Sequence, residues 1–128
     1  DGKTCVHICF GYAALIHERP EGYSFLPEFA DTCCDRVSIE TAQSGLDCSI
    51  LESLQSKDIL LGVIDLSNSE IESVEVIKQR VKKALEFVDA QNIILAPDCG
   101  MKYLSRESSF GKLQNMVQAA TELRKEHT

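Results

Sequence analysis

The sequence predicts an α/β fold made of four consecutive βα units. Four short apolar runs alternate with segments of helical periodicity, and the third and fourth runs are nearly all apolar, as in parallel strands covered on both faces. The 128 residues suffice for one domain, and fractions of 44% hydrophobic and 26% charged residues are typical of a soluble globular protein. Such units fit either an open doubly wound sheet or half of a (β/α)8 barrel. A complete barrel of this kind needs about 250 residues. Periodicity alone leaves both open.

The strands are expected over residues 5–10, 36–40, 59–65 and 92–96. Each is short and rich in apolar side chains, as a strand in a buried parallel sheet should be. The carboxyl ends of such strands meet at one rim, where the functional residues of βα folds gather.

Two helical segments are expected in the first half of the chain. Residues 22–33 are read as helical, although Pro27 leaves the start of that helix open. Residues 47–55 are read as a short helix with Ile50, Leu51 and Leu54 on one side.

The second half contains the two clearest helices. Residues 74–88 carry one apolar stripe, with Ser73 as N-cap and Glu75 in the first turn. The stripe consists of Val74, Ile77, Val81, Ala84, Leu85 and Val88. A last helix, about residues 110–125, ends in basic residues, as the helix dipole prefers. It is expected to bury Leu113, Met116, Val117, Ala120 and Leu123.

Composition excludes several classes of function. A net charge of −7 and a pI near 4.9 argue against nucleic acid or an anionic membrane as a partner. The longest apolar stretch, residues 59–64, is far too short to span a bilayer, and no secretion signal is visible. We therefore expect a cytoplasmic protein. Because the chain begins at Asp1, we expect either a processed chain or a piece of a longer one.

The six cysteines are irregularly spaced, and nothing in the sequence suggests a disulfide framework. We interpret them as reduced thiols. Cys33, Cys34 and Cys48 are expected to be small buried apolar residues.

Four side chains at or just beyond strand ends form a candidate zinc site. They are His7, Cys9, Glu40 and Cys99. One imidazole, two thiols and one carboxylate are a plausible ligand set for zinc. Each also has an ordinary interpretation: packing for the His-x-Cys pair, an N-cap or surface charge for the carboxylate, and an inert thiol in a turn. Their joint placement on successive strand ends favours the metal.

Three further polar residues are weaker candidates. Asp65 ends the third strand and is either a catalytic or ligand-binding carboxylate or a cap for the following loop. His17 lies in a loop-like stretch and is expected to be exposed to solvent, and His127 lies at the chain end with no expected role.

Four segments of the chain resemble the C-terminal catalytic portion of cobalamin-independent methionine synthase, a zinc-dependent thiol alkyltransferase family with a (β/α)8 barrel. They are His7-Ile8-Cys9-Phe10, Val37-Ser38-Ile39-Glu40-Thr41, Gly62-Val63-Ile64-Asp65 and Pro97-Asp98-Cys99-Gly100-Met101-Lys102. The resemblance implies that His7, Cys9, Glu40 and Cys99 bind zinc, and that residues 1–128 are the last four strands of the barrel. The implied partners are homocysteine, a methyl donor such as methyltetrahydrofolate, and either the missing N-terminal half-barrel or a second copy of the chain.

One position departs from the family pattern. Long-type members place a histidine, the suggested proton donor to the folate leaving group, two residues after the aspartate of the third segment. This chain has Ser67 there, and serine is a poor acid at neutral pH. The departure favours another methyl donor or electrophile. Two alternatives to methionine synthesis stay open: alkylation of another thiol such as coenzyme M, and a fragment that holds zinc without turnover.

Overall fold

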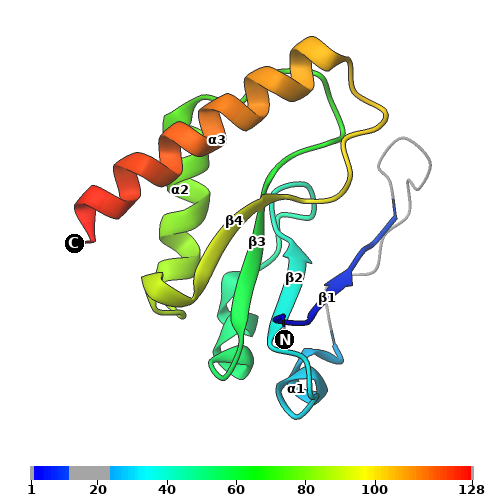
Figure 1. The fold of residues 1–128 in the computed structure, drawn as a ribbon, viewed down its shortest axis with the longest axis vertical. Coiled ribbons are helices and arrows are strands. Elements are labelled where there is room, and N and C mark those ends of the chain that lie inside the picture. Colours follow the sequence, from blue (N-terminus) through cyan, green and yellow to red (C-terminus); the bar gives the residue numbers. More distant parts are fainter. Residues whose placement is uncertain (1, 12–23, 128) are drawn as a thin grey trace.

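The computed structural model describes residues 2–11 and 24–127 (Figure 1). Four parallel strands form one sheet: β1 (Cys5–Ile8), β2 (Arg36–Glu40), β3 (Asp58–Ile64) and β4 (Ile93–Pro97). They alternate with α1 (Leu26–Ala30), the 3-10 helix η1 (Cys48–Leu54), α2 (Val74–Leu85), the 3-10 helix η2 (Ala90–Asn92) and α3 (Arg106–Glu126). The predicted α/β class is therefore confirmed.

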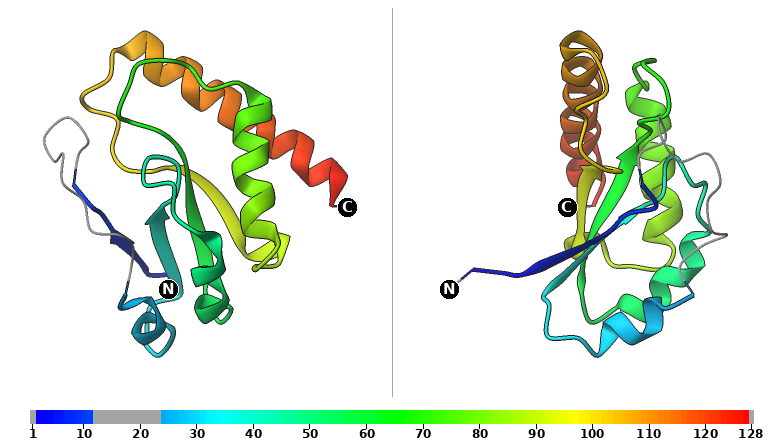
Figure 2. Two further views of the ribbon diagram at one scale, coloured as in Figure 1. Left: turned by 180° about the vertical axis from the view of Figure 1, so that it is seen from behind. Right: turned by 90° about the vertical axis from the view of Figure 1, so that its right-hand side faces the viewer.

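The order of the strands decides between the two architectures. Each strand pairs with the next one in sequence, in the order β1-β2-β3-β4. A doubly wound sheet reverses its strand order at a switch point, and the sheet of the described residues has none. The helical segments α1, η1 and α2 lie on the same side of the sheet (Figure 2). This is the arrangement of a sector of a (β/α)8 barrel.

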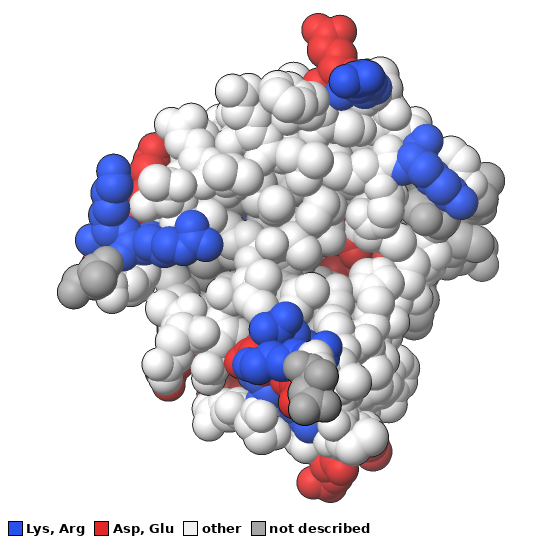
Figure 3. Space-filling view, viewed as in Figure 1, with Lys and Arg blue, Asp and Glu red and all other residues white. Residues whose placement is uncertain are grey.

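The core lies between the helices and one face of the sheet. Alternate residues of β2 and β3 have no exposed surface on this face, among them Val37, Ile39, Ile59 and Leu61. The opposite face carries His7 and Ser38, and it also carries Ile94, which is 37% exposed. Most of the face seen in Figure 3 is uncharged, with separate groups of charged side chains at its left, its right and its lower middle. One face of the sheet is thus available for a site.

Helix α2 forms as its sequence predicts. Ser73 accepts the backbone N–H of Val76 at 3.3 Å and caps the first turn. Ile77, Val81 and Ala84 are buried against the sheet and its neighbours. The helix ends at Leu85, a few residues earlier than expected, and Val88 is buried beyond its end.

Helix α3 begins at Arg106 and buries only part of the expected apolar set: Leu123 is buried and Met116 packs against the core. Val117 is 61% and Leu113 is 37% exposed, so the prediction that they belong to the core is wrong. Lys112 is fully buried instead, because its ammonium group donates to the Asp65 carbonyl at 2.9 Å and to the Glu72 carboxylate at 2.8 Å. These polar contacts hold Lys112 against the loop that follows β3.

Two further expectations need correction. Among described residues of the segment 22–33, only Leu26–Ala30 is α-helical, with Pro27 in the first turn; residues 22 and 23 lie outside the described part. The segment 47–55 forms a 3-10 helix rather than an α-helix, capped by Asp47, which accepts the N–H of Ser49.

The cysteines are only partly where the sequence predicted them. Cys34 and Cys48 are buried, but Cys33 is exposed. Lys57, itself buried, donates to the carbonyls of Thr32 and Cys34 at 2.6 and 2.7 Å and fixes this turn. With the turn held in this way, the Cys34 side chain points into the core and that of its neighbour Cys33 points to solvent.

Within the described ranges, none of the helices combines the length and apolar character that crossing a bilayer requires.

Candidate metal centre

The four predicted ligands meet at the rim formed by the carboxyl ends of the strands. His7 lies in β1 and Cys9 directly follows that strand, Glu40 is the last residue of β2, and Cys99 follows β4. One ligand atom from each side chain lies within 4.8 Å of the others. Residues from three strand ends thus surround one small volume, as the sequence analysis expected.

The distance between the two sulfurs suits a shared ion. Cys9 Sγ and Cys99 Sγ are 3.6 Å apart, and both thiols are free. Two sulfurs bound about 2.3 Å from one tetrahedral zinc ion lie roughly 3.8 Å from each other. A disulfide bond would bring them to about 2 Å. The spacing therefore fits two ligands of one ion.

The imidazole of His7 is oriented by the neighbouring strand. His7 pairs in register with Ser38 of β2, and His7 Nδ1 lies 2.8 Å from Ser38 Oγ. This contact engages one ring nitrogen and leaves Nε2 for an ion. Metal-binding histidines are commonly held in this way by a hydrogen bond on their other nitrogen.

The surroundings of Cys9 favour a neutral thiol unless a cation is present. Burial, together with hydrogen bonds to Glu40 and Cys99, raises the pKa of the Cys9 thiol to about 12, although the Gly11 N–H, 3.1 Å from Cys9 Sγ, opposes the shift. The Glu40 residue is itself 1% exposed. Metal ligands must be deprotonated, so a bound divalent cation would reverse this preference. A set of two sulfurs, one imidazole and one carboxylate fits zinc.

Asp98 is a residue that the sequence analysis had not singled out. It is 1% exposed and accepts backbone N–H groups from Thr41 and Ala42 on Oδ1, at 3.2 and 3.1 Å, and from Gln43 on Oδ2, at 2.7 Å. Burial raises its pKa to about 7, against the effect of these N–H groups, and the negative charge of Glu40 adds to the rise. The only sequence signal was its place in Pro97-Asp98-Cys99-Gly100, between a strand and a ligand.

Asp65 lies at the same rim but outside the cluster of four. Its Oδ1 accepts the backbone N–H of Ser67 at 2.7 Å, so the carboxylate caps its own loop. The Asp65 backbone is held on both sides: its N–H donates to Glu72, and its carbonyl accepts from Lys112.

The candidate ligand set does not include the other two histidines. His17 lies outside the described residues, and His127 is exposed at the end of α3.

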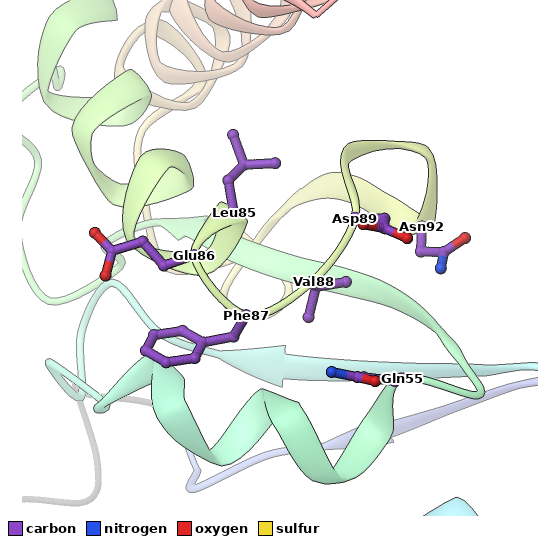
Figure 4. Close-up of a pocket in the computed structure, with 7 residues that line it drawn as sticks. All are labelled: Gln55, Leu85, Glu86, Phe87, Val88, Asp89 and Asn92. Atoms are coloured by element: carbon purple, nitrogen blue, oxygen red, sulfur yellow. The ribbon is translucent and has the colours of Figure 1, made fainter.

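An open pocket lies at the other end of the sheet (Figure 4). It is lined by Gln55, Leu85, Glu86, Phe87, Val88, Asp89 and Asn92. Gln55 precedes β3 and Asn92 precedes β4, so this pocket is at the amino ends of the strands, away from the candidate ligands.

The fold and the cluster together define an α/β protein of the barrel type with a candidate metal centre at its carboxyl rim. The chain matches the family described as "Cobalamin-independent synthase, Catalytic domain" over residues 16–122. This match includes Glu40 and Cys99, while His7 and Cys9 precede it. The chain belongs to the cobalamin-independent methionine synthase family.

Individual relatives extend the likeness to nearly the whole chain. The methionine synthases of Pyrococcus horikoshii and Pyrococcus furiosus are 34% and 32% identical over 97% of this chain, and that of Methanothermobacter thermautotrophicus is 34% identical over 93%. The aligned part is 34%, 34% and 40% of those proteins, so the chain spans about a third of their length.

A solved structure shares the fold. The B12-independent methionine synthase from Shewanella sp. W3-18-1, in complex with selenomethionine, superposes with a TM-score of 0.84 at 29% identity. The superposition covers 97% of this chain and 39% of that protein.

Proposed function

We propose that this chain carries the thiol-methylating site of a cobalamin-independent methionine synthase, and that His7, Cys9, Glu40 and Cys99 hold its zinc ion. The observation that carries the proposal is the convergence of these four side chains within 4.8 Å in a member of this family. When bound, zinc would lower the pKa of an incoming thiol. A dication with two thiolates and one carboxylate has a formal charge of about −1, which leaves a bound sulfur electron-rich.

The protein's own residues would prepare this chemistry. Ser38 orients His7, and the two cysteines and Glu40 supply the negative charge that keeps the substrate sulfur nucleophilic. In the reaction, a lone pair of the homocysteine thiolate forms the new S–CH3 bond, and the bond between the methyl group and its donor breaks. The leaving group keeps that electron pair; a folate nitrogen would also take up the proton that homocysteine loses on forming its thiolate, whereas a corrinoid leaves without one. Asp65, at the same rim, is our candidate for a carboxylate that assists this step.

The methyl donor is proposed to differ from that of long-type synthases. Ser67 stands where those proteins place a histidine, and its backbone N–H is engaged with Asp65. Because a hydroxyl cannot replace an imidazolium as an acid, methyltetrahydrofolate should be a poor donor. Assays with methyltetrahydrofolate and with a methyl-corrinoid show which of the two serves as the methyl donor. Replacing homocysteine with coenzyme M shows which thiol is methylated.

We further propose that residues 1–128 form the C-terminal half of a catalytic barrel. The strand order and the coverage of about a third of the relatives' length support this. An N-terminal half-barrel, or a second copy of the chain, would then cover the open sheet face. The 128-residue chain alone should be inactive, and the full-length protein active; equal activity of the two would contradict this arrangement.

The test of the metal site is the variant Cys99→Ser in the full-length protein, with Cys33→Ser as control. Cys33 is an exposed thiol outside the cluster. We expect Cys99→Ser to lose bound zinc and homocysteine methylation together, and Cys33→Ser to keep both, as measured by elemental analysis and methionine formation. Full methylation by protein that contains no zinc would overturn the proposal.

A further inference from the structure

A buried carboxylate joins two of the segments that carry the candidate ligands. Asp98 directly precedes Cys99, and its side chain accepts the backbone N–H groups of Thr41, Ala42 and Gln43 at 3.2, 3.1 and 2.7 Å. Those three residues directly follow Glu40. One side chain therefore ties the backbone after Glu40 to the backbone before Cys99, although these two residues are far apart in sequence.

The fold is built closely around this carboxylate. A Cβ atom on Gly62 of β3 would lie 2.3 Å from Asp98 Oδ1 and 2.7 Å from the Ile39 carbonyl oxygen. The Asp98 backbone is fixed as well, since its N–H donates to the Ile64 carbonyl at 3.2 Å. A buried carboxylate is costly unless it is well hydrogen-bonded, and here the backbone supplies the bonds.

An uncharged isostere could not do the same. An asparagine side chain has one acceptor oxygen and an amide group that only donates. At this position its amide would face at least one of the backbone N–H groups, so a donor would meet a donor. Only a carboxylate accepts on both of its oxygens, as the three N–H groups require.

We propose that Asp98 is a positioning residue of the metal centre: it sets the distance between Glu40 and Cys99 before any ion binds. This inference rests on the proposed metal site but not on methyl transfer. The three hydrogen bonds hold the two segments in place without a metal, so the ligands need little rearrangement on binding. Preorganisation of this kind strengthens metal binding, and loss of such outer contacts typically weakens it by about 10- to 100-fold.

The experiment compares Asp98→Asn with Asp58→Asn in the full-length protein. Asp58 is a matched control, because it lies at the amino end of β3 and bonds to Lys3 and Arg36, away from the cluster. The affinities for Zn²⁺ and Co²⁺ are measured by competition with a chelator, and the visible spectrum of the cobalt form reports the ligand geometry. We expect Asp98→Asn to bind both ions about 10- to 100-fold more weakly, with an altered cobalt spectrum. Asp58→Asn should match the wild type.

A second measurement needs no variant and covers the case in which Asp98→Asn does not fold. In metal-free wild-type protein, the amide hydrogens of Ala42 and Gln43 should exchange slowly, and zinc should change their rates little; Thr41 is left out because its N–H also donates to the Gly62 carbonyl. Rapid exchange that becomes slow only with zinc would mean that the ion, not Asp98, orders this segment, and would overturn the inference. Wild-type affinity and spectrum in folded Asp98→Asn would also overturn it. A wild type that binds neither ion would reject the proposed metal site itself.

Discussion

Gly62 lies in β3 where the Asp98 side chain comes closest to the sheet. It has no side chain, and the space that a Cβ would need is filled by Asp98 Oδ1, the Asp98 Cα at 2.8 Å and the Ile39 carbonyl. Two of these three atoms belong to the backbone, so a small side chain cannot be accommodated by a simple rotamer change. At the scale of single residues, this glycine allows the Asp98 contact to form.

We therefore predict that Gly62→Ala pushes Asp98 away from Thr41–Gln43. The expected result is a loss of about 1–3 kcal/mol in the free energy of unfolding, together with weaker zinc binding. Urea denaturation and chelator competition measure the two effects. Gly2→Ala is the control, because a Cβ at Gly2 meets nothing within 4 Å. If Gly62→Ala behaves like Gly2→Ala, the close contact with Asp98 has no energetic importance.

Residue types at strand ends predicted the cluster of four ligands but not the residues, Asp98 and Ser38, that hold them in place. His7, Cys9, Glu40 and Cys99 have recognisable metal-binding chemistry, and the βα repeat brings strand ends together. Asp98 was not foreseen, since its role depends on the backbone N–H groups of a segment more than 50 residues away. The contact between Ser38 and His7 likewise follows from the register of β1 and β2, which periodicity does not give.

At the scale of elements, α3 is held to the rim by polar residues along one face. Ser108 donates to the Ser69 carbonyl at 2.5 Å, Lys112 to Asp65 and Glu72, and Asn115 to the Glu72 carbonyl at 2.7 Å. These contacts fix the loop between β3 and α2. The helix was expected, but the burial of Lys112 was not, because a lysine is rarely buried unless it is paired, and its partners lie 40 and 47 residues away in the sequence.

We predict that Lys112→Met destabilises the protein strongly. The substitution leaves the buried Glu72 carboxylate with Arg80 as its ion-pair partner and the Asp65 carbonyl without its ammonium donor. Leaving a buried charge without any partner costs about 3–5 kcal/mol, and the remaining Arg80 ion pair should keep the loss at or below that range. Chemical denaturation measures this loss in the free energy of unfolding.

The matched control is Lys82→Met in α2. The Lys82 side chain is 52% exposed and lies 3.7 Å from Glu126, so its loss should cost less than about 1 kcal/mol. Lys112→Arg should recover part of the stability, because a cation is retained. Equal stability of Lys112→Met and Lys82→Met would show that the buried pair contributes nothing.

At the scale of the whole molecule, stability should fall in acid. Burial opposes the ionisation of Glu72, but hydrogen bonds from Lys112, the Asp65 N–H and Arg80 outweigh it and hold the pKa of this carboxyl below its ordinary value of 4.5. A carboxyl whose pKa is lower in the folded than in the unfolded chain contributes full stability above its unfolded pKa. That contribution is lost as the pH falls through the folded pKa.

We expect the free energy of unfolding to decrease below about pH 4.5, and to decrease less steeply in Glu72→Gln, which lacks the titrating group. Urea denaturation from pH 3 to pH 7 checks this. Glu52→Gln, at an exposed position, serves as control and should follow the wild type. Parallel pH profiles for Glu72→Gln and the wild type would contradict the assignment.

The strand order was the one architectural question that the sequence left open. Hydrophobic runs locate strands but do not say which strands are neighbours. The four strands lie within one or two residues of their expected bounds, and their order β1-β2-β3-β4 settles the barrel-type arrangement.

The distance in sequence between the two cysteines has a consequence for biosynthesis. Cys9 and Cys99 are 90 residues apart and follow the first and last strands of the sheet. During translation, His7, Cys9 and Glu40 leave the ribosome long before Cys99, so a nascent chain offers only an incomplete and weaker chelating set. If these residues hold an ion as proposed, its tight capture would wait until the fourth strand has joined the sheet. Metal loading would then follow the assembly of this sheet rather than guide an early step of its folding.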